Sequence, residues 1–424
     1  MNRDSRRAAV LSWVMLGFVT LIYYFANMQK VLVPGATFNE VQQLFRLDAA
    51  SVTRLGAVFL YVYAAGQLIV GPLADRFSGV RVILVGGIIF CAGSLLSSCT
   101  GSFALLCVSR FLTGMGAAAI YLSMVKEIAG VVGPTLPFWI GIATIIGYSG
   151  AITGTSPFVA GVEKFGYSRM MLGTGLLTLL IYVCFALTAS RMKLPPVNSG
   201  VRISLNSYWA VLKIRHNLCN FGVSGINFGT YFALQSIIGK KFLEDFCRMS
   251  SHGAGAVMTA TMVIAAVNGF IMANISRCCG NRRKPFLVGS AFGCLVGALM
   301  MFGAVAADIH APALAVSGIV LLAVAGNMST IYVALIRETN AENRFGTALS
   351  VGNCLAYAVT AVFGGVLGKL MDLYPHEVVN GVNVYGRNSY LLVFGTLGSL
   401  IAISVILSLF LRESRGQDIS ASVR

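Results

Sequence analysis

The sequence contains few charged residues for its length. Of its 424 residues, 11% are Asp, Glu, Lys or Arg, whereas 57% are apolar. A soluble domain is about one-quarter charged, so this chain has too few charges to solvate a globular surface. We therefore expect it to be embedded in a lipid bilayer.

Acidic residues are scarcer than basic ones, with 15 Asp and Glu against 31 Lys and Arg. The net charge of +16 does not indicate nucleic-acid binding, because the basic residues form no continuous patch. They occur in short clusters between apolar runs, a pattern that orients helices in a membrane. We therefore expect no nucleic-acid partner.

Signatures of metal, cofactor and catalytic sites are also missing. The ten cysteines form no C-x-x-C pair, and no histidine cluster has the spacing of a zinc site. The sequence has no G-x-S-x-G elbow and no phosphate-binding loop. We expect neither metal nor cofactor, and these absences argue against a membrane-embedded enzyme.

Twelve apolar runs are long enough to cross about 30 Å of hydrocarbon at roughly 20 residues each. They are continuous and do not alternate like the ~10-residue strands of a barrel, so they predict an all-α polytopic membrane protein with 12 transmembrane helices. The first run follows a basic N-terminus, but it is too long for a signal peptide and no cleavage site follows it. The runs cover residues 11–33, 52–73, 82–99, 103–125, 137–159, 169–190, 217–239, 254–275, 285–305, 312–335, 346–368 and 389–411.

The longest polar interruption divides these runs into six plus six. It contains Pro195-Pro196 and predicts an N-terminal six-helix bundle (1–190), a cytoplasmic linker (191–216) and a C-terminal six-helix bundle (217–424). Lys and Arg are about twice as frequent in the segments on the N-terminal side of the membrane as in those on the other side. This bias predicts that both termini are cytoplasmic.

Several motifs carry a family resemblance. The loop Gly71–Arg81 reads GPLADRFSGVR, span 4 contains Arg110–Gly116 (RFLTGMG), and span 5 contains Gly147–Gly154 (GYSGAITG). With Phe228–Gln235 and Arg344–Asn353, they resemble the major facilitator superfamily of transporters, and more specifically its bacterial sugar-phosphate permease-like branch.

The resemblance implies two bundles with a solute path lined by helices 1, 4, 7 and 10, to which helix 11 contributes. It also implies that loop 71–81 is a latch between the halves. Organophosphate members of the branch carry an arginine about eight residues before a helix-1 proline. Counting back from Pro34 gives Ala26, and Lys30 lies one turn later. Lys30 either replaces that cation or extends to the membrane interface, so a phosphate substrate is not implied.

Polar side chains form stripes on two otherwise apolar spans. Tyr23, Asn27 and Lys30 are spaced i, i+4, i+7 in span 1, and the range 227–235 repeats the pattern with Asn227, Tyr231 and Gln235. Such a stripe should face a cavity and not lipid. The alternative is hydrogen bonding between helices, worth about 0.6 kcal/mol per bond in lipid.

Arg110 lies deep inside span 4, where an isolated charge is costly. It either forms an anion site, modulates a proton-carrying group, or bonds to backbone carbonyls to brace the bundle. Lys30 is either a cavity cation or a lysine that extends to the interface. With the Lys240–Lys241 pair, these residues predict a positive field along the solute path, which favours an anionic substrate.

The loop glycines and Asp75 suggest a gate. Gly71 and Gly79 are expected to permit close backbone approach and a tight turn, and Asp75 to dock on the N–H groups at the start of helix 11. Lys126-Glu127 either joins this network or lies at the interface. In span 5, Gly150 and Gly154 should let two helices approach closely.

We predict a secondary active or facilitative transporter that moves a small anionic organic molecule by alternating access. Because no acid or histidine lies within a span, we expect coupling to be either absent, as in uniport or exchange, or carried by the substrate's own charge. The alternatives are proton-coupled efflux of drugs or metabolites, and a ligand sensor that transports nothing. We expect a monomer in a bacterial inner membrane.

The predicted site residues fall into two groups. The substrate-binding residues are Tyr23, Asn27, Lys30, Arg110, Tyr121, Asn227, Tyr231, Gln235, Asn327, Asn353 and Tyr357. The gating residues are Gly71, Asp75, Arg76, Gly79, Arg81 and Arg344.

Overall fold

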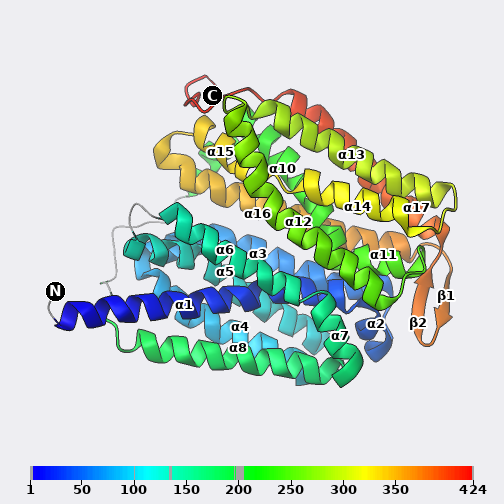
Figure 1. Ribbon diagram of the computed structural model, residues 1–424, viewed down its shortest axis with the longest axis horizontal. Helices are drawn as coiled ribbons and strands as arrows, with labels where there is room; N and C mark the ends of the chain where they lie inside the picture. Colours follow the sequence, from blue (N-terminus) through cyan, green and yellow to red (C-terminus); the bar gives the residue numbers. More distant parts are fainter. Residues whose placement is uncertain (1–2, 100, 133–135, 195, 197–204, 423–424) are drawn as a thin grey trace. The chain divides into compact units, whose positions relative to one another are not determined.

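A computed structural model describes residues 3–99, 101–132, 136–194, 196 and 205–422, and it is mainly helical (Figure 1). Each predicted span coincides with one helix or with two successive helices, which confirms the all-α membrane class. The helices are α1 (Arg3–Val31), α2 (Phe38–Phe45), α3 (Ala49–Phe77), α4 (Gly79–Cys99), α5 (Phe103–Val132), α6 (Leu136–Thr153), α7 (Ser156–Phe165), α8 (Tyr167–Ala189), α9 (Leu205–Leu212), α10 (Arg215–Ala233), α11 (Gly239–Asp245), α12 (Ser251–Cys278), α13 (Lys284–Ala306), α14 (Pro312–Gly326), α15 (Ser329–Thr339), α16 (Glu342–Met371) and α17 (Arg387–Leu409).

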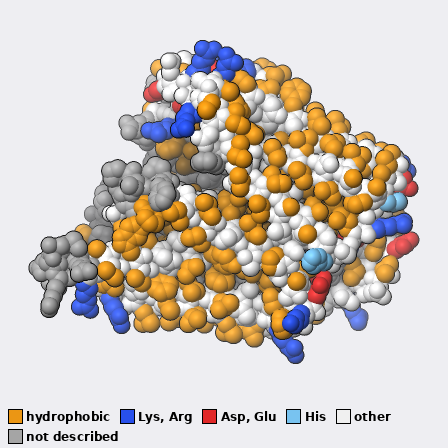
Figure 2. All heavy atoms as spheres, viewed as in Figure 1, with side chains coloured by type: hydrophobic (Ala, Val, Ile, Leu, Met, Phe, Trp, Pro, Cys, Tyr) orange, Lys and Arg blue, Asp and Glu red, His pale blue; other side chains and the backbone are white. Residues whose placement is uncertain are grey.

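Ten segments of the described chain are long and apolar enough to cross a membrane. Two predicted spans are interrupted. The fifth breaks between α6 and α7, where Pro157 stands in the first turn of α7, and the tenth breaks at Asn327 between α14 and α15. A kink follows α1 at Val33, whose φ and ψ of −124° and 119° are not helical, and a short π-helical segment, Leu234–Ile238, follows α10. Figure 2 shows hydrophobic side chains covering most of the viewed face.

The chain forms two compact units. Unit 1 contains Met1–Leu32 and Val58–Ile203, and unit 2 contains Val33–Ala57 and Ser204–Arg424. The segment Val33–Ala57 therefore packs with the C-terminal helices, although it precedes most of unit 1 in sequence. The predicted linker 191–216 contains α9, and the part of it at residues 195 and 197–204 lies outside the described residues.

Glycines set the closest helix contacts in unit 1. A Cβ atom on Gly150 of α6 would lie 2.1 Å from the carbonyl oxygen of Tyr24 in α1, and one on Gly154 would lie 2.9 Å from Val31. Because no larger residue fits, α1 and α6 approach closely only with this small-residue spacing. The prediction for Gly150 and Gly154 is confirmed.

Unit 2 contains a β-hairpin that the sequence analysis did not predict. Strand β1 (His376–Val379) pairs antiparallel with β2 (Val382–Tyr385). Asn380 and Gly381 connect them with φ values of 52° and 77°, as a two-residue hairpin turn requires.

The hairpin lies beside the segment Val33–Ala57 within unit 2. The Tyr385 hydroxyl donates to Asp372 Oδ1 over 2.9 Å and accepts from the Ala49 N–H over 2.9 Å. Asp372 also accepts from the N–H groups of Ala49 and Ala50, so a carboxylate caps the start of α3. These bonds explain why the first turns of α3 pack with unit 2.

Candidate functional site

The polar stripe of α1 faces the interior of unit 1. Tyr23, Asn27 and Lys30 are 8%, 9% and 6% exposed. Gly147 of α6 brings that helix against the stripe, because a Cβ atom there would lie 2.2 Å from the Tyr23 ring. Tyr121 of α5 packs against Tyr23 with ring centroids 5.3 Å apart. The structure thus brings four predicted substrate-binding residues of α1 and α5 into one region.

Lys30 contacts both its own helix and α3. Its Nζ donates to Asn27 Oδ1 over 3.4 Å and to the Tyr63 hydroxyl over 3.1 Å. The same Nζ lies 4.2 Å from the centroid of the Tyr63 ring. Of the two alternatives for Lys30, the structure matches the one in which the side chain points into the bundle, and substrate binding by Lys30 stays a prediction.

Arg110 of α5 is almost completely buried, with 1% of its surface exposed. Its Nη1 donates to the Gln29 carbonyl oxygen over 3.1 Å, and its Cζ lies 4.5 Å from the centroid of the Phe59 ring. The backbone bond fits the bracing alternative, while the ring contact stabilises the cation without neutralising it. Bracing the bundle and binding an anion are therefore both compatible with this geometry.

Phe59 and Tyr63 were not predicted as site residues. They lie one turn apart on α3, with ring centroids 6.1 Å apart and ring planes inclined by 9°. Two aromatic residues four positions apart on a helix normally indicate core packing, so Phe59 and Tyr63 were not selected from the sequence. The expected burial of Lys30 and Arg110 could have indicated them, because buried cations favour contact with aromatic ring faces.

A groove of about 500 Å³ runs along α1 on the side of α6. Trp13 and Trp139 pack together across it, with ring centroids 4.6 Å apart. The groove reaches Thr20 and Ile146, and Ile146 adjoins Gly147, which contacts the polar stripe. The groove therefore ends next to the predicted substrate-binding residues of α1.

The corresponding stripe of α10 lies inside unit 2. Asn227 Nδ2 donates to Ser290 of α13 and to the Tyr332 hydroxyl of α15, and its Oδ1 accepts from Ser404 of α17 over 2.7 Å. Gln235 donates to the Met258 carbonyl oxygen and accepts from Thr261. These bonds match the alternative of hydrogen bonding between helices, and substrate binding by this stripe stays a prediction.

Four further tyrosine and asparagine residues complete the predicted set in unit 2. Tyr231 contacts Met262 Sδ at 3.8 Å, and Tyr357 packs edge-on against Phe228 with centroids 5.4 Å apart. Asn327 donates to the Ala265 carbonyl oxygen at the break between α14 and α15. Asn353 lies half-buried on α16.

The turn between α3 and α4 differs from the prediction. Helix α3 continues through Gly71 to Phe77, and the residue with positive φ is Ser78, at 79°. Gly79 is needed for close approach instead, because a Cβ atom there would lie 2.5 Å from the Ser123 carbonyl oxygen. The tight turn predicted at the two glycines is thus wrong, whereas the close backbone approach is confirmed for Gly79 and not for Gly71.

The other predicted gating residues lie at helix ends. Arg81 Nη1 donates to the Phe77 carbonyl oxygen over 2.9 Å, whereas Arg76 and Arg344 are exposed. The side chain of Asp75 lies outside the described residues, so its docking on helix 11 stays a prediction.

Lys126 and Glu127 hold this turn within unit 1. Lys126 Nζ donates to the Ala74 carbonyl oxygen over 2.6 Å near the end of α3, and Glu127 Oε1 accepts from the Val80 N–H over 3.1 Å at the start of α4. Each charge matches the dipole of the helix end it contacts. These two residues therefore bond to the ends of α3 and α4 that form the turn.

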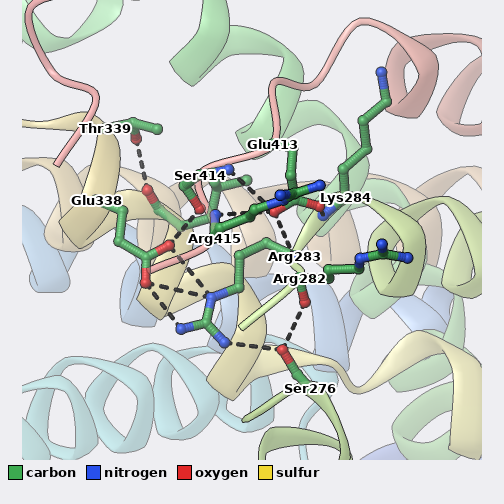
Figure 3. Close-up of polar contacts among 10 residues, drawn as sticks. Ser276, Arg282, Arg283, Lys284, Glu338, Thr339, Glu413, Ser414 and Arg415 are labelled. Atoms are coloured by element: carbon green, nitrogen blue, oxygen red, sulfur yellow. Dashed lines mark hydrogen bonds and ion pairs between the residues drawn. The ribbon is translucent and has the colours of Figure 1, made fainter. Parts of the chain in front are cut away.

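The basic loop before α13 has its own acidic partners (Figure 3). Arg283 pairs with Glu338 at 2.9 Å, and both side chains are 12% exposed. Glu413, which follows α17, accepts from the N–H groups of Arg283 and Lys284. Carboxylates from two later segments of unit 2 thus supply the negative charge that this loop lacks.

The Lys240–Lys241 pair is also neutralised within unit 2. Lys240 pairs with Glu244 at 3.3 Å and Lys241 with Asp245 at 2.8 Å, one turn later on the same helix. The expectation that these lysines add to a positive field was therefore wrong. The spacing i, i+4 in the sequence was the signal that could have shown it.

The family follows from comparison with known proteins. A family model described as "Major Facilitator Superfamily" matches residues 8–239, which is more than half of the chain. The chain belongs to the Major Facilitator Superfamily. Its ten long apolar helices within the described residues agree with an integral membrane protein of this superfamily.

Individual relatives of this superfamily member match over shorter stretches. The probable sulfoacetate transporter SauU of Cupriavidus necator is 29% identical over 103 residues, which are 24% of each chain. Monocarboxylate transporter 2 of Homo sapiens is 28% identical over 109 residues, or 25% of this chain and 22% of that protein. The chain thus matches about a quarter of the length of these curated relatives.

Among solved structures, the crystal structure of the nucleoside transporter NupG superimposes with a TM-score of 0.71. The superposition covers 95% of this chain and 100% of that one at 13% identity. A D323A mutant of the same protein gives a TM-score of 0.66 over 94% of this chain and 99% of that one, also at 13% identity. At this identity the similarity establishes the fold of the superfamily.

Proposed function

We propose that this transporter moves a small anionic organic solute across the membrane by alternating access. The observation that carries the proposal is the burial of Lys30 and Arg110 inside unit 1, where the contacts described above stabilise two cations. Inside a membrane protein, buried ionisable residues mark solute and ion pathways. The two relatives named for sulfoacetate and monocarboxylates point to the same class of solute.

The predicted substrate-binding residues of α1 and α5 form the anion-binding region of this proposal. Tyr23, Asn27 and Tyr121 would supply hydrogen bonds beside Lys30. Membership of the sugar-phosphate permease-like branch stays part of the proposal. So do the cytoplasmic position of both termini, the bacterial inner membrane and the monomeric state.

Flux through proteoliposomes tests the proposal. Labelled organic anions should be taken up, and Lys30→Met and Arg110→Met should each reduce uptake at least about tenfold, as expected when one charge-assisted contact is lost. Lys164→Met removes an exposed lysine of the same unit and serves as the control. Uptake of a cationic solute with Arg110→Met fully active would contradict the proposal.

The same assay separates the alternatives. Uptake measured at several pH values detects proton coupling, and binding without flux would identify a ligand sensor. The Asp75 latch is tested by cross-linking Asp75→Cys to Thr347→Cys. Failure to cross-link under every condition of substrate and pH would count against the latch.

A further inference from the structure

A second groove, of about 320 Å³, lies along α13 and α14 of unit 2. Glycines keep it open on the side of α13. A Cβ atom on Gly289 would meet no atom of a neighbouring element within 4 Å, whereas one on Gly293 would lie 2.9 Å from the Ala325 side chain. The groove is therefore widest near the start of α13 and narrows one turn further along the helix.

The lining of this groove is apolar. Ser290 is the one polar side chain among the described lining residues, and its hydroxyl is already bonded. It donates to the Ala325 carbonyl oxygen over 2.6 Å and accepts from Asn227 Nδ2 over 3.1 Å. A hydrocarbon fits such a lining, because binding it leaves no polar group without a partner.

The length of the groove matches one leaflet of a bilayer. Pro285 and Gly293 both line it, and they lie eight residues apart, which is about 12 Å along a helix. Half of a hydrocarbon core of about 30 Å is about 15 Å. One acyl chain of one leaflet would therefore lie in the groove over most of its depth.

Two arginines stand at the end of the membrane-spanning helices where the groove begins. Arg277 lies in the last turn of α12 and Arg282 directly precedes Arg283, the N-cap of α13, and both are exposed. Figure 3 shows the Arg282 side chain pointing away from Glu338, which pairs with Arg283. Arg277 Nη2 bonds to the neutral Asn274 amide over 3.2 Å. Within the described part of the chain, neither arginine has a carboxylate partner.

These arginines are close enough to the groove to bind the headgroup of the same molecule. Arg282 precedes Pro285, a lining residue, by three positions, so their Cα atoms are at most about 11 Å apart. Basic residues between membrane-spanning helices bind the headgroups of anionic lipids. An apolar groove and a basic entrance together match a molecule with a hydrocarbon chain and an anionic head.

We propose that this groove is a binding site for an anionic phospholipid. One acyl chain lies between α13 and α14, and Arg277 and Arg282 bind the phosphate of the headgroup. The inference goes beyond the proposed function and does not depend on which solute is transported.

Lipid titration of the purified full-length protein in detergent micelles, followed by native mass spectrometry, tests the inference. Dioleoyl phosphatidylglycerol should bind about tenfold or more tightly than dioleoyl phosphatidylcholine, because the two arginines attract its net charge. Glycerol phosphate carries the same phosphate without acyl chains, and it should not displace the bound lipid.

Arginine variants test the headgroup contacts. Arg277→Gln and Arg282→Gln should each weaken phosphatidylglycerol binding about fivefold and leave phosphatidylcholine binding unchanged. Arg248→Gln is the matched control, because Arg248 is an exposed arginine that precedes the opposite end of α12. If all three variants weakened binding equally, general charge attraction would replace the proposed site.

Glycine variants test the groove itself. Gly289→Phe fills the open part of the groove and should weaken binding of phosphatidylglycerol at least about tenfold. Gly303→Phe is the control, because a Cβ atom on Gly303 of the same helix also meets no neighbouring atom within 4 Å, and Gly303 does not line the groove. Unchanged phosphatidylglycerol binding in Gly289→Phe would overturn the inference.

The wild-type comparison decides the main point even if a variant fails to fold. Equal affinities for the two lipids, or displacement by glycerol phosphate, would overturn the inference. If Gly289→Phe instead dissociated a wild-type dimer and left lipid binding unchanged, the groove would be an interface between two copies of the chain, and the lipid site would be rejected.

Discussion

The two units stabilise buried cations in different ways. In unit 1, Lys30 and Arg110 lie against the rings of Tyr63 and Phe59. In unit 2, Lys241 pairs with Asp245 at 2.8 Å, and the pair is 0% and 3% exposed. A ring attracts a cation and leaves its charge in place, whereas a carboxylate cancels it. The proposed function assigns Lys30 and Arg110 to binding, whereas the Lys241–Asp245 ion pair links two residues of one helix of unit 2.

The strongest way to break this comparison is to remove one cation from each unit. Lys241→Met should lower the free energy of unfolding by about 3–5 kcal/mol, because it leaves the Asp245 carboxylate buried without its partner. Lys30→Met should lower it by only about 0.5–2 kcal/mol, the range for a cation–π contact. Denaturant-induced unfolding in mixed micelles measures both values.

A double variant checks the cause of the larger effect. Lys241→Met combined with Asp245→Leu should recover part of the lost stability, since the unpaired carboxylate is gone but the Tyr385 N–H and the Tyr390 hydroxyl lose their acceptor. Equal losses in the two single variants would show that the units do not differ in this respect.

The second prediction uses pH to test the same ion pair. Burial raises the pKa of the Asp245 carboxyl from its ordinary value of 3.8 to about 6, against the opposing effects of Lys241 and of hydrogen bonds from Tyr385 and Tyr390. The folded protein therefore binds more protons than the unfolded chain between these two values. The contribution of Asp245 to stability should then fall as the pH rises from about 4 to about 6, and level off above it.

Thermal unfolding of the wild type and of Asp245→Asn across this pH range measures how the contribution of Asp245 to stability changes. The wild type should lose stability relative to Asp245→Asn as the pH rises, although the variant is less stable overall because Lys241 loses its partner. Parallel pH profiles for the two proteins would contradict the assignment. The difference in stability between the wild type and Lys30→Met should stay constant over the same pH range, because Lys30→Met keeps Asp245.

The positions of the helices and the burial of Arg110 could be predicted from the sequence. The residues to which the buried and turn residues bond could not. Long apolar runs specify spans directly, and the hydrocarbon forces Arg110 into the interior. The turn at Ser78 and the helix break at Asn327 depend on which neighbouring helix supplies a bond, which one chain segment does not show.

Other features were present in the sequence but were not recognised. The Asn380-Gly381 pair between alternating residues is typical of a hairpin, and the i, i+4 spacing from Lys241 to Asp245 is typical of a helical ion pair. The packing of Val33–Ala57 with unit 2 could not be predicted, because it depends on Asp372, more than 300 residues away in sequence.

The third prediction compares how the units cap equivalent helices. Glu127 accepts from one N–H group at the start of α4, whereas Glu413 accepts from two at the start of α13. Glu413→Ala should therefore reduce stability by about 2 kcal/mol and Glu127→Ala by about 1 kcal/mol. Hydrogen exchange should increase mainly in the first turn of the helix concerned. If either variant increased hydrogen exchange equally in α4 and in α13, the assignment of these glutamates as local caps would be contradicted.

The last prediction isolates the aromatic contribution in unit 1. Phe59→Leu and Phe90→Leu both remove a fully buried ring from this unit, so they lose comparable packing. The Phe59 ring also contacts the Arg110 guanidinium, whereas the close contact of Phe90 with Gly116 is made by the Phe90 backbone, which the substitution keeps. Phe59→Leu should therefore lower the free energy of unfolding by about 1 kcal/mol more than Phe90→Leu does. Phe59→Tyr keeps the ring and should behave like the wild type in the same unfolding measurement. If the two leucine variants lose equal stability, Arg110 is held by its backbone bond to Gln29 alone, and the contrast between rings in one unit and carboxylates in the other would be limited to Lys30.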